Sequence, residues 1–170
     1  MEITIRKMEE TDYDAVYDIY VEGIETENAT YETAPPANWE SWIGSKINSC
    51  SLVAVGDEKI LGWAALSPVS KRNVFRGVAE VSIYIANEAK GNRVGSKLLD
   101  ALIDVSEKNN FWTLQSGIFP DNDVSLHLHY EHGFVKVGNR EKMGQMPYGK
   151  RKGEWRDVVI LERRSKVVGV

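Results

Sequence analysis

The spacing of hydrophobic residues along the chain alternates between a period of two, typical of strands, and a period of three to four, typical of helices. Ile3 and Ile5 alternate with polar residues and predict a first strand. Thr11 is expected to cap the first helix, with Asp12 and Asp14 in its first turn. Helical spacing recurs at Val16, Ile19, Tyr20 and Ile24, at Trp39, Ile43 and Ile47, at Val94, Leu98, Leu102 and Val105, and over residues 124–132, where Gly133 ends the helix.

Six further strands are predicted, at residues 52–55, 60–66, 78–85, 111–119, 134–137 and 158–161. The resulting order, β-α-α-β-β-β-α-β-α-β-β, predicts a mixed α/β fold. Its sheet is expected to be mostly antiparallel and flanked by about four helices. No repeat, low-complexity tract or linker interrupts the chain, so residues 1–170 are expected to form one domain.

Composition narrows the class of protein. The chain has 170 residues, 42% hydrophobic and 27% charged, as in ordinary globular proteins. A net charge of −4 disfavours general nucleic-acid binding, and no apolar run is long enough for a membrane span. The N-terminus lacks the apolar segment of a secretory signal, and the single cysteine, Cys50, has no partner for an internal disulfide. We therefore expect a reduced, cytoplasmic protein.

Charge is unevenly distributed. Residues 136–166 contain ten Lys or Arg and four Asp or Glu, so this segment carries +6 and the rest of the chain −10. One interpretation is a set of solvated strand edges. The other is a positive rim that attracts the phosphates of a nucleotide.

The segment 90–96, Lys-Gly-Asn-Arg-Val-Gly-Ser, lies between a predicted strand and a predicted helix. A helix N-terminus has unpaired N–H groups and a partial positive charge, and glycine allows a ligand to approach closely, so the segment suits a pyrophosphate. An ordinary strand-to-helix turn would have the same spacing. Neither the G-x-x-x-x-G-K-[ST] loop of nucleotide hydrolases nor the dinucleotide-binding G-x-G-x-x-G is present.

Two segments resemble the GNAT acyltransferase superfamily. The strand 79–85 and the loop after it are similar to the family's acetyl-CoA motif Q/R-x-x-G-x-G/A, with Lys90 first and Gly95 last. Arg93 stands where the middle glycine is usual. Residues 122–134 resemble the family's N-x-x-S/A-x-x-L-[HY] helix, which ends in Gly-Phe. The resemblance implies the GNAT acyl-CoA N-acyltransferase fold.

Within the superfamily, the chain is most similar to the phosphinothricin N-acetyltransferase group. The shared features are Phe75-Arg76-Gly77, Leu128-His129 and Gly149-x-Arg151-x-Gly153-x-Trp155-x-Asp157. This resemblance implies transfer of the acetyl group of acetyl-CoA to the amine of an amino acid or analogue. Phosphinothricin, methionine sulfone and methionine sulfoximine are examples of such acceptors. It also suggests a homodimer, formed through the last strands.

Attack of an amine on a thioester needs a base, because the amine is mostly protonated near neutral pH. Glu80 lies in an apolar strand pattern with Ser82 on the same face, and partial burial would make its carboxylate a stronger base. A cross-strand ion pair is the alternative from spacing alone; the resemblance implies the base. It also implies that backbone N–H groups near Tyr84 and Ile85 face the thioester. His129 would donate a proton to the leaving sulfur or hydrogen-bond to it.

The acceptor side is expected to include Arg76 and Arg72, which would bind a carboxylate, with Tyr31 and Phe75 as an apolar wall. A solvated loop is the alternative for the two arginines. The residues expected to bind acetyl-CoA are Ile83, Tyr84, Ile85, Lys90, Gly91, Asn92, Arg93, Val94, Gly95, Ser96, Asn122 and Ser125.

Other readings stay open. No metal is expected, because His129 and His132 have no acidic or thiol partner at the spacing of a known site. The same fold could instead act on a protein N-terminus, a polyamine or an aminoglycoside. A third alternative is a non-catalytic acyl-CoA sensor.

Overall fold

The computed structural model describes all 170 residues, and its element order confirms the predicted α/β arrangement. The strands are β1 (Thr4–Lys7), β2 (Ser51–Gly56), β3 (Lys59–Pro68), β4 (Val78–Ile85), β5 (Thr113–Ile118), β6 (Val135–Gln145) and β7 (Trp155–Arg164). The α-helices are α1 (Tyr13–Glu25), α2 (Trp39–Gly44), α3 (Val94–Lys108) and α4 (Asp123–Glu131). Four short 3-10 turns lie between these elements, and no helix is long and apolar enough to cross a membrane.

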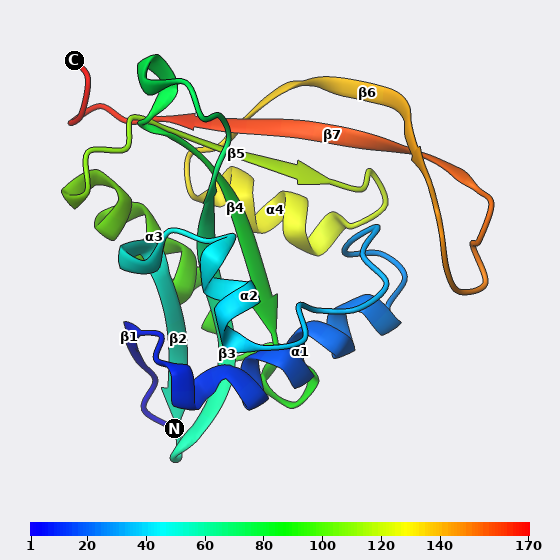
Figure 1. The fold of residues 1–170 in the computed structure, drawn as a ribbon, viewed down its shortest axis with the longest axis horizontal. Helices are drawn as coiled ribbons and strands as arrows, with labels where there is room; N and C mark the ends of the chain where they lie inside the picture. Colours follow the sequence, from blue (N-terminus) through cyan, green and yellow to red (C-terminus); the bar gives the residue numbers. More distant parts are fainter.

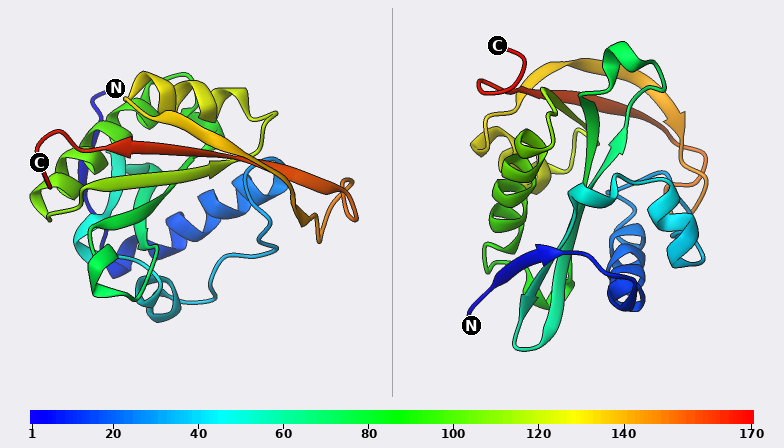
Figure 2. Two further views of the ribbon diagram at one scale, coloured as in Figure 1. Left: turned by 90° about the horizontal axis from the view of Figure 1, so that it is seen from above. Right: turned by 60° about the vertical axis from the view of Figure 1, so that its left-hand side comes forward.

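One mixed sheet runs through the molecule in the order β1-β2-β3-β4-β5-β7-β6. Every neighbouring pair is antiparallel except β4 and β5, which are parallel. Helices α1 and α2 cover one face, and α3 and α4 cover the other (Figure 2). The long β6–β7 hairpin extends beyond the rest of the sheet (Figure 1). The arrangement agrees with the predicted mixed, mostly antiparallel sheet flanked by four helices.

The parallel pair separates soon after it forms. Pairing between β4 and β5 is confined to three positions, the last of which joins Glu80 to Gln115. On its other edge β4 stays paired with β3 as far as Ile85. The two strands therefore diverge, as Figure 1 shows, and the edge of β4 beyond Glu80 has no strand partner on the β5 side.

An aromatic layer holds β3 and β4 against α1 and α2. The rings of Trp63 and Tyr84, which are direct cross-strand partners, stack with centroids 4.8 Å apart. Tyr20 also stacks on Tyr84, at 4.7 Å, and lies 5.5 Å from Trp63, while Trp42 meets Trp63 edge to face at 4.6 Å. Gly23 allows this approach, since a Cβ there would lie 2.4 Å from the Tyr84 ring. This packing fixes the strand that borders the groove.

Three local predictions were wrong. Thr11 does not cap α1; the N-cap is Asp12, whose buried carboxylate makes no capping bond and instead accepts two 2.8 Å hydrogen bonds from Arg6. Helix α2 ends at Gly44, so Ile47 lies beyond it. The last two strands are longer than predicted, because their exposed halves, full of polar residues, do not show the alternation that marks a half-buried strand.

Candidate active site

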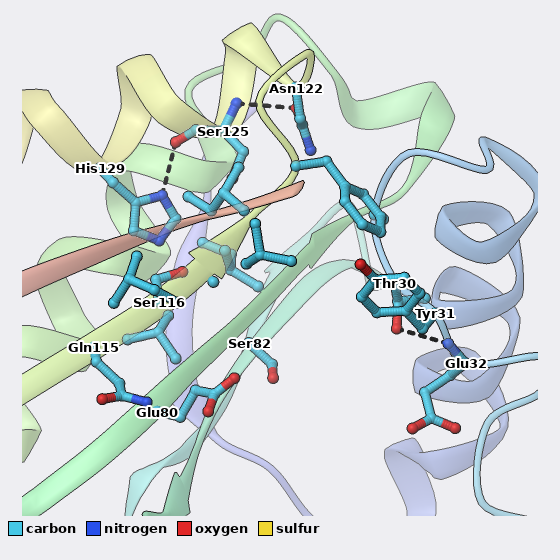
Figure 3. A pocket seen from close by; sticks show the side chains of 18 of the residues that line it. Thr30, Tyr31, Glu32, Glu80, Ser82, Gln115, Ser116, Asn122, Ser125 and His129 are labelled. Atoms are coloured by element: carbon cyan, nitrogen blue, oxygen red, sulfur yellow. Dashed lines mark hydrogen bonds between the residues drawn. The ribbon is translucent and has the colours of Figure 1, made fainter. Parts of the chain in front are cut away.

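The divergence of β4 and β5 opens a cavity of about 690 Å³. Its floor is formed by the two strands, and its walls by the segment 29–32 after α1, by α4 and by the β6–β7 hairpin (Figure 3). Seven of the predicted site residues line this cavity: Tyr31, Glu80, Ile83, Tyr84, Asn122, Ser125 and His129.

Glu80 stands where the parallel pairing ends. It is directly opposite Gln115 on β5 and Ser67 on β3, and its side chain points into the cavity beside that of Ser82 (Figure 3). The expected partial burial of Glu80 is wrong: the residue is exposed, because the strands separate and the cavity opens to solvent at this position. Its carboxylate makes no ion pair within the molecule, so it is free to meet a ligand.

His129 faces the cavity from α4 and is almost completely buried. Its Nδ1–H donates to the carbonyl of Ser125 at 2.7 Å, which leaves the lone pair of Nε2 for another partner. Nε2 has no hydrogen-bond partner within the protein. Burial lowers the pKa of His129, which keeps the ring neutral near pH 7. A neutral ring held in this way presents an acceptor to the cavity.

Asn122 sets the start of α4. Its Oδ1 accepts from the backbone N–H of Ser125 at 3.2 Å, which is an N-cap, and its Nδ2 donates to the carbonyl of Asn28 at 3.1 Å. One side chain thus fixes both the helix that carries His129 and the segment that forms the opposite wall.

The loop of residues 90–96 lies outside the cavity, at the N-terminus of α3. Gly91 and Arg93 both have left-handed backbones, with φ of 83° and 62°, and no side chain caps the helix. The first N–H groups of α3 are therefore open to a ligand. A Cβ on Gly95 would lie 3.3 Å from Leu128, so glycine here allows α3 and α4 to pack closely.

Three predicted substrate residues lie away from the cavity of this chain. Arg72 places its guanidinium over the ring of Phe75, 5.2 Å from its centroid. Arg76 lies over Trp112 at 5.5 Å and donates to the carbonyl of Asn73. All three exposed side chains belong to the β3–β4 connection and pack on one another or on nearby aromatic rings.

The β6–β7 hairpin holds one wall of the cavity in place, which the sequence motifs did not predict. Arg156 is 3% exposed and donates to the carbonyl of Glu27 and to the side chains of Asn28 and Asp121, at 2.6 to 2.8 Å. Its guanidinium also stacks on Phe119, 3.6 Å from the centroid. The motif around residues 149–157 was visible in the sequence, but two of its partners, Glu27 and Asn28, lie more than 100 positions earlier.

Tyr31 is held from the same side. Its hydroxyl donates to the carbonyl of Arg156 at 3.0 Å, and its ring meets Phe119 edge to face at 5.0 Å. The ring also covers Gly144, where a Cβ would lie 2.9 Å from it. Tyr31 is thus a fixed aromatic wall of the cavity.

Lys46 is a second residue that no sequence motif singled out. It follows α2, lines the cavity, and donates through Nζ to Ser67 Oγ at 3.2 Å. Nζ also lies 4.9 Å from the ring centroid of Trp42. Burial lowers the pKa of Lys46, and the negative charges of Glu80 and Glu32 oppose that shift.

Comparison with known proteins gives the class of protein to which this fold and cavity belong. Residues 13–134 match the Acetyltransferase (GNAT) family, and the protein belongs to that family. It is an N-acetyltransferase, an enzyme class whose acetyl donor is acetyl-CoA.

Individual relatives indicate which members of the family the chain is similar to. The chain is 32% identical over 165 residues to phosphinothricin N-acetyltransferase of Alcaligenes faecalis, covering 94% of this chain and 81% of that protein. It is 26% identical over 168 residues to an L-methionine sulfoximine/L-methionine sulfone acetyltransferase of Pseudomonas aeruginosa, covering 95% and 94%. A crystal structure of a phosphinothricin acetyltransferase from Sinorhizobium meliloti with acetyl-CoA superposes with a TM-score of 0.86 at 27% identity, covering 99% and 91%.

Proposed function

We propose that the protein acetylates the amine of a small amino-acid-like acceptor of the phosphinothricin or methionine sulfone and sulfoximine type. Family membership and the two named relatives support this acceptor class. The observation that carries the proposal is the divergence of β4 and β5, with the unpaired carboxylate of Glu80 at the point where it begins. A cytoplasmic location and a homodimer belong to the same proposal.

The residues present fit acetyl-CoA. When bound, this cosubstrate supplies a thioester whose carbonyl carbon an amine can attack. The unpaired edge of β4, from Ile83 to Ile85, has backbone groups that can pair with an extended amide chain, as a peptide adds to a sheet edge. An N–H group of this edge can also stabilise negative charge on a carbonyl oxygen, worth about 3 kcal/mol for one well-placed donor.

The N-terminus of α3 supplies the anion site in this proposal. Residues 91–96 offer backbone N–H groups and the positive end of the helix dipole. Lys90, whose ammonium donates to Asn87 Oδ1 at 2.7 Å, adds a cation beside them. Asn122 and Ser125 border the groove at the start of α4.

Glu80 serves as the general base. Its carboxylate takes a proton from the incoming ammonium, directly or through a water molecule, and so frees the nitrogen lone pair. Two observations support this role: it lines the cavity, and no cation of the protein pairs with it. His129 has no proton to give to a leaving thiolate, because its ring is neutral and its only N–H is held by the Ser125 carbonyl; its free Nε2 suits it to accept a hydrogen bond from the thiol once that thiol has taken up the proton lost by the attacking nitrogen.

The test is release of free thiol from acetyl-CoA in the presence of amino acids and their sulfone, sulfoximine and phosphinic analogues, with polyamines, peptides and aminoglycosides as competing acceptors. Glu80→Gln should lower kcat by about 100-fold while leaving acetyl-CoA affinity within about twofold, because only proton transfer is removed. The matched control is Glu58→Gln on the exposed β2–β3 turn, which makes the same Glu-to-Gln change away from the cavity. Gln115→Glu, opposite Glu80 on β5, would not serve as a control because it adds a charge.

Equal rates for wild type and Glu80→Gln would remove Glu80 from the mechanism. Faster turnover of polyamines or peptides than of the amino-acid analogues would show that the proposed acceptor class is wrong. Tight binding of acetyl-CoA without turnover of any amine would support a sensor instead of an enzyme.

A further inference from the structure

The cavity contains a cation and an anion that do not neutralise each other. Lys46 and Glu80 both line it, yet no ion pair within 4.0 Å joins them, and neither pairs with another charged group. The only hydrogen bond from the Lys46 ammonium goes to the neutral hydroxyl of Ser67. Two of its three donors remain available.

The register of the sheet places both charges next to Ser67. Ser67 and Glu80 are direct partners across the antiparallel β3–β4 pair, so their side chains leave the same face of the sheet about 5 Å apart at Cβ. The Lys46 ammonium lies 3.2 Å from the Ser67 hydroxyl. Lys46 and Glu80 thus both lie next to Ser67 on the cavity floor, without approaching within the 4.0 Å of an ion pair.

An α-amino acid carries the complementary pair of charges. Its carboxylate and its ammonium are attached to one carbon atom, and each needs a partner of opposite sign when it leaves water. If the ammonium lies at Glu80, the carboxylate can reach Lys46. The side chain of the acceptor would then extend toward Tyr31 and the hairpin wall.

The surroundings of Lys46 favour this use. Its ammonium lies over the ring of Trp42, which restricts the side chain and partly shields it from water. Burial lowers the pKa of Lys46, and a bound carboxylate would offset that effect by stabilising the charged form. The other cation of the cavity, Arg140, is exposed on β6, and Arg72 and Arg76 lie outside the cavity of this chain.

We propose that Lys46 binds the carboxylate of the acceptor and thereby selects free α-amino acids over simple amines. This inference rests on the proposed function and deepens it, because it names the group that distinguishes the substrate class. It assigns Lys46 a substrate-binding role and gives it no part in proton transfer.

The experiment compares an acceptor amino acid with its methyl ester, which keeps the amine but loses the carboxylate charge. Lys46→Met should raise KM for the free acid by about 10- to 100-fold, the range expected for a hydrogen bond to a charged group. It should leave KM for acetyl-CoA and kcat within about twofold. On the ester, Lys46→Met and wild type should differ by less than threefold. Lys46→Arg should restore part of the affinity for the free acid.

Lys59→Met, at the exposed first residue of β3, is the matched control and should behave as wild type. Arg72→Gln and Arg76→Gln test the rival arginines predicted from the sequence. Thermal melts of each variant establish that it is folded. An equal loss on acid and ester, or a loss confined to the arginine variants, would overturn the assignment to Lys46.

Calorimetry with the acceptor alone separates this inference from acetyl transfer. Carboxylate-dependent binding that Lys46→Met abolishes supports the inference even when no thiol is released. Turnover of the free acid at an unchanged KM in Lys46→Met refutes it while the proposed function stands. Absence of both binding and turnover in the wild type would refute both.

Discussion

Arg93 has a left-handed backbone, with φ of 62° and ψ of 19°, at the N-cap of α3. For a residue with a side chain, this conformation costs about 1 kcal/mol relative to glycine. Gly91, two positions earlier, has a left-handed backbone without that penalty. The resemblance placed a glycine at position 93, and the backbone there keeps the conformation that glycine favours.

Arg93→Gly should therefore raise the free energy of unfolding by about 1 kcal/mol, since it relieves the strain of the left-handed residue. Urea denaturation measures the change. Lys97→Gly, one turn later inside α3, is the contrasting control and should lower stability by about 1 kcal/mol, because glycine is unfavourable within a helix. A loss of stability in Arg93→Gly would show that the arginine side chain contributes more than its backbone costs.

At the scale of elements, the β6–β7 hairpin acts as a clamp on the segment between α1 and α2. Besides Arg156, it uses Tyr148, whose hydroxyl lies 3.0 Å from the carbonyl of Ile24 and 2.9 Å from that of Thr30. Gly149 lies so close to Glu27 that a Cβ there would overlap its carboxylate. The wall of the acceptor cavity is therefore held by a hairpin more than 100 residues away in sequence.

Tyr148→Phe removes one hydroxyl from this clamp. We expect a loss of about 1 kcal/mol in the free energy of unfolding, because two partly buried carbonyls lose their shared donor. KM for the acceptor should rise several-fold, while KM for acetyl-CoA changes by less than twofold. Tyr130→Phe, an exposed tyrosine on α4, should change none of these values. Equal effects on both KM values would mean that the hairpin supports the whole groove.

At the scale of the whole molecule, β6 is an edge strand of the sheet and is 11 residues long. The hairpin exposes four large apolar side chains, between 54% and 62% accessible: Val135, Val137, Met143 and Trp155. Exposed edge strands with apolar side chains tend to pair with another chain. The expected homodimer thus has a candidate surface on this hairpin.

Val137→Lys should shift the protein from dimer to monomer in light scattering coupled to size-exclusion chromatography, because a charge at the centre of this surface would be desolvated by pairing. Val124→Lys places the same charge on an exposed position of α4 and should leave the mass unchanged. A wild-type mass of one chain across the micromolar range would contradict the dimer. An unchanged dimer in Val137→Lys would move the interface elsewhere.

The whole structure also explains the positive charge of residues 136–166, near the C-terminus. Arg151 pairs with Asp121 and Glu154 at 2.8 Å, and Arg156 shares Asp121. Arg163 lies 3.9 Å from Glu107. Folding therefore offsets part of the +6 charge with acids from other segments, which favours internal ion pairs over a rim for phosphates.

Local sequence was enough to predict the order of the elements and the resemblance to the family. The periods around residues 78–85 and 94–105 depend only on neighbouring positions, so β4 and α3 were predictable. The motif residues Asn122 and Ser125 are likewise near neighbours, and their capping bond follows from their spacing. Local periodicity could not predict the exposed half of the hairpin, because the polar residues there show no periodic pattern.

Only the tertiary structure decided which residues form the cavity. Lys46 and Glu80 line the same cavity because both are neighbours of Ser67, and Arg156 meets Asn28 because the hairpin folds back across the molecule. The exposure of Glu80 depends on where β4 and β5 diverge. Contacts between distant segments arise from strand order and packing, which leave no trace in the spacing of residues along the chain.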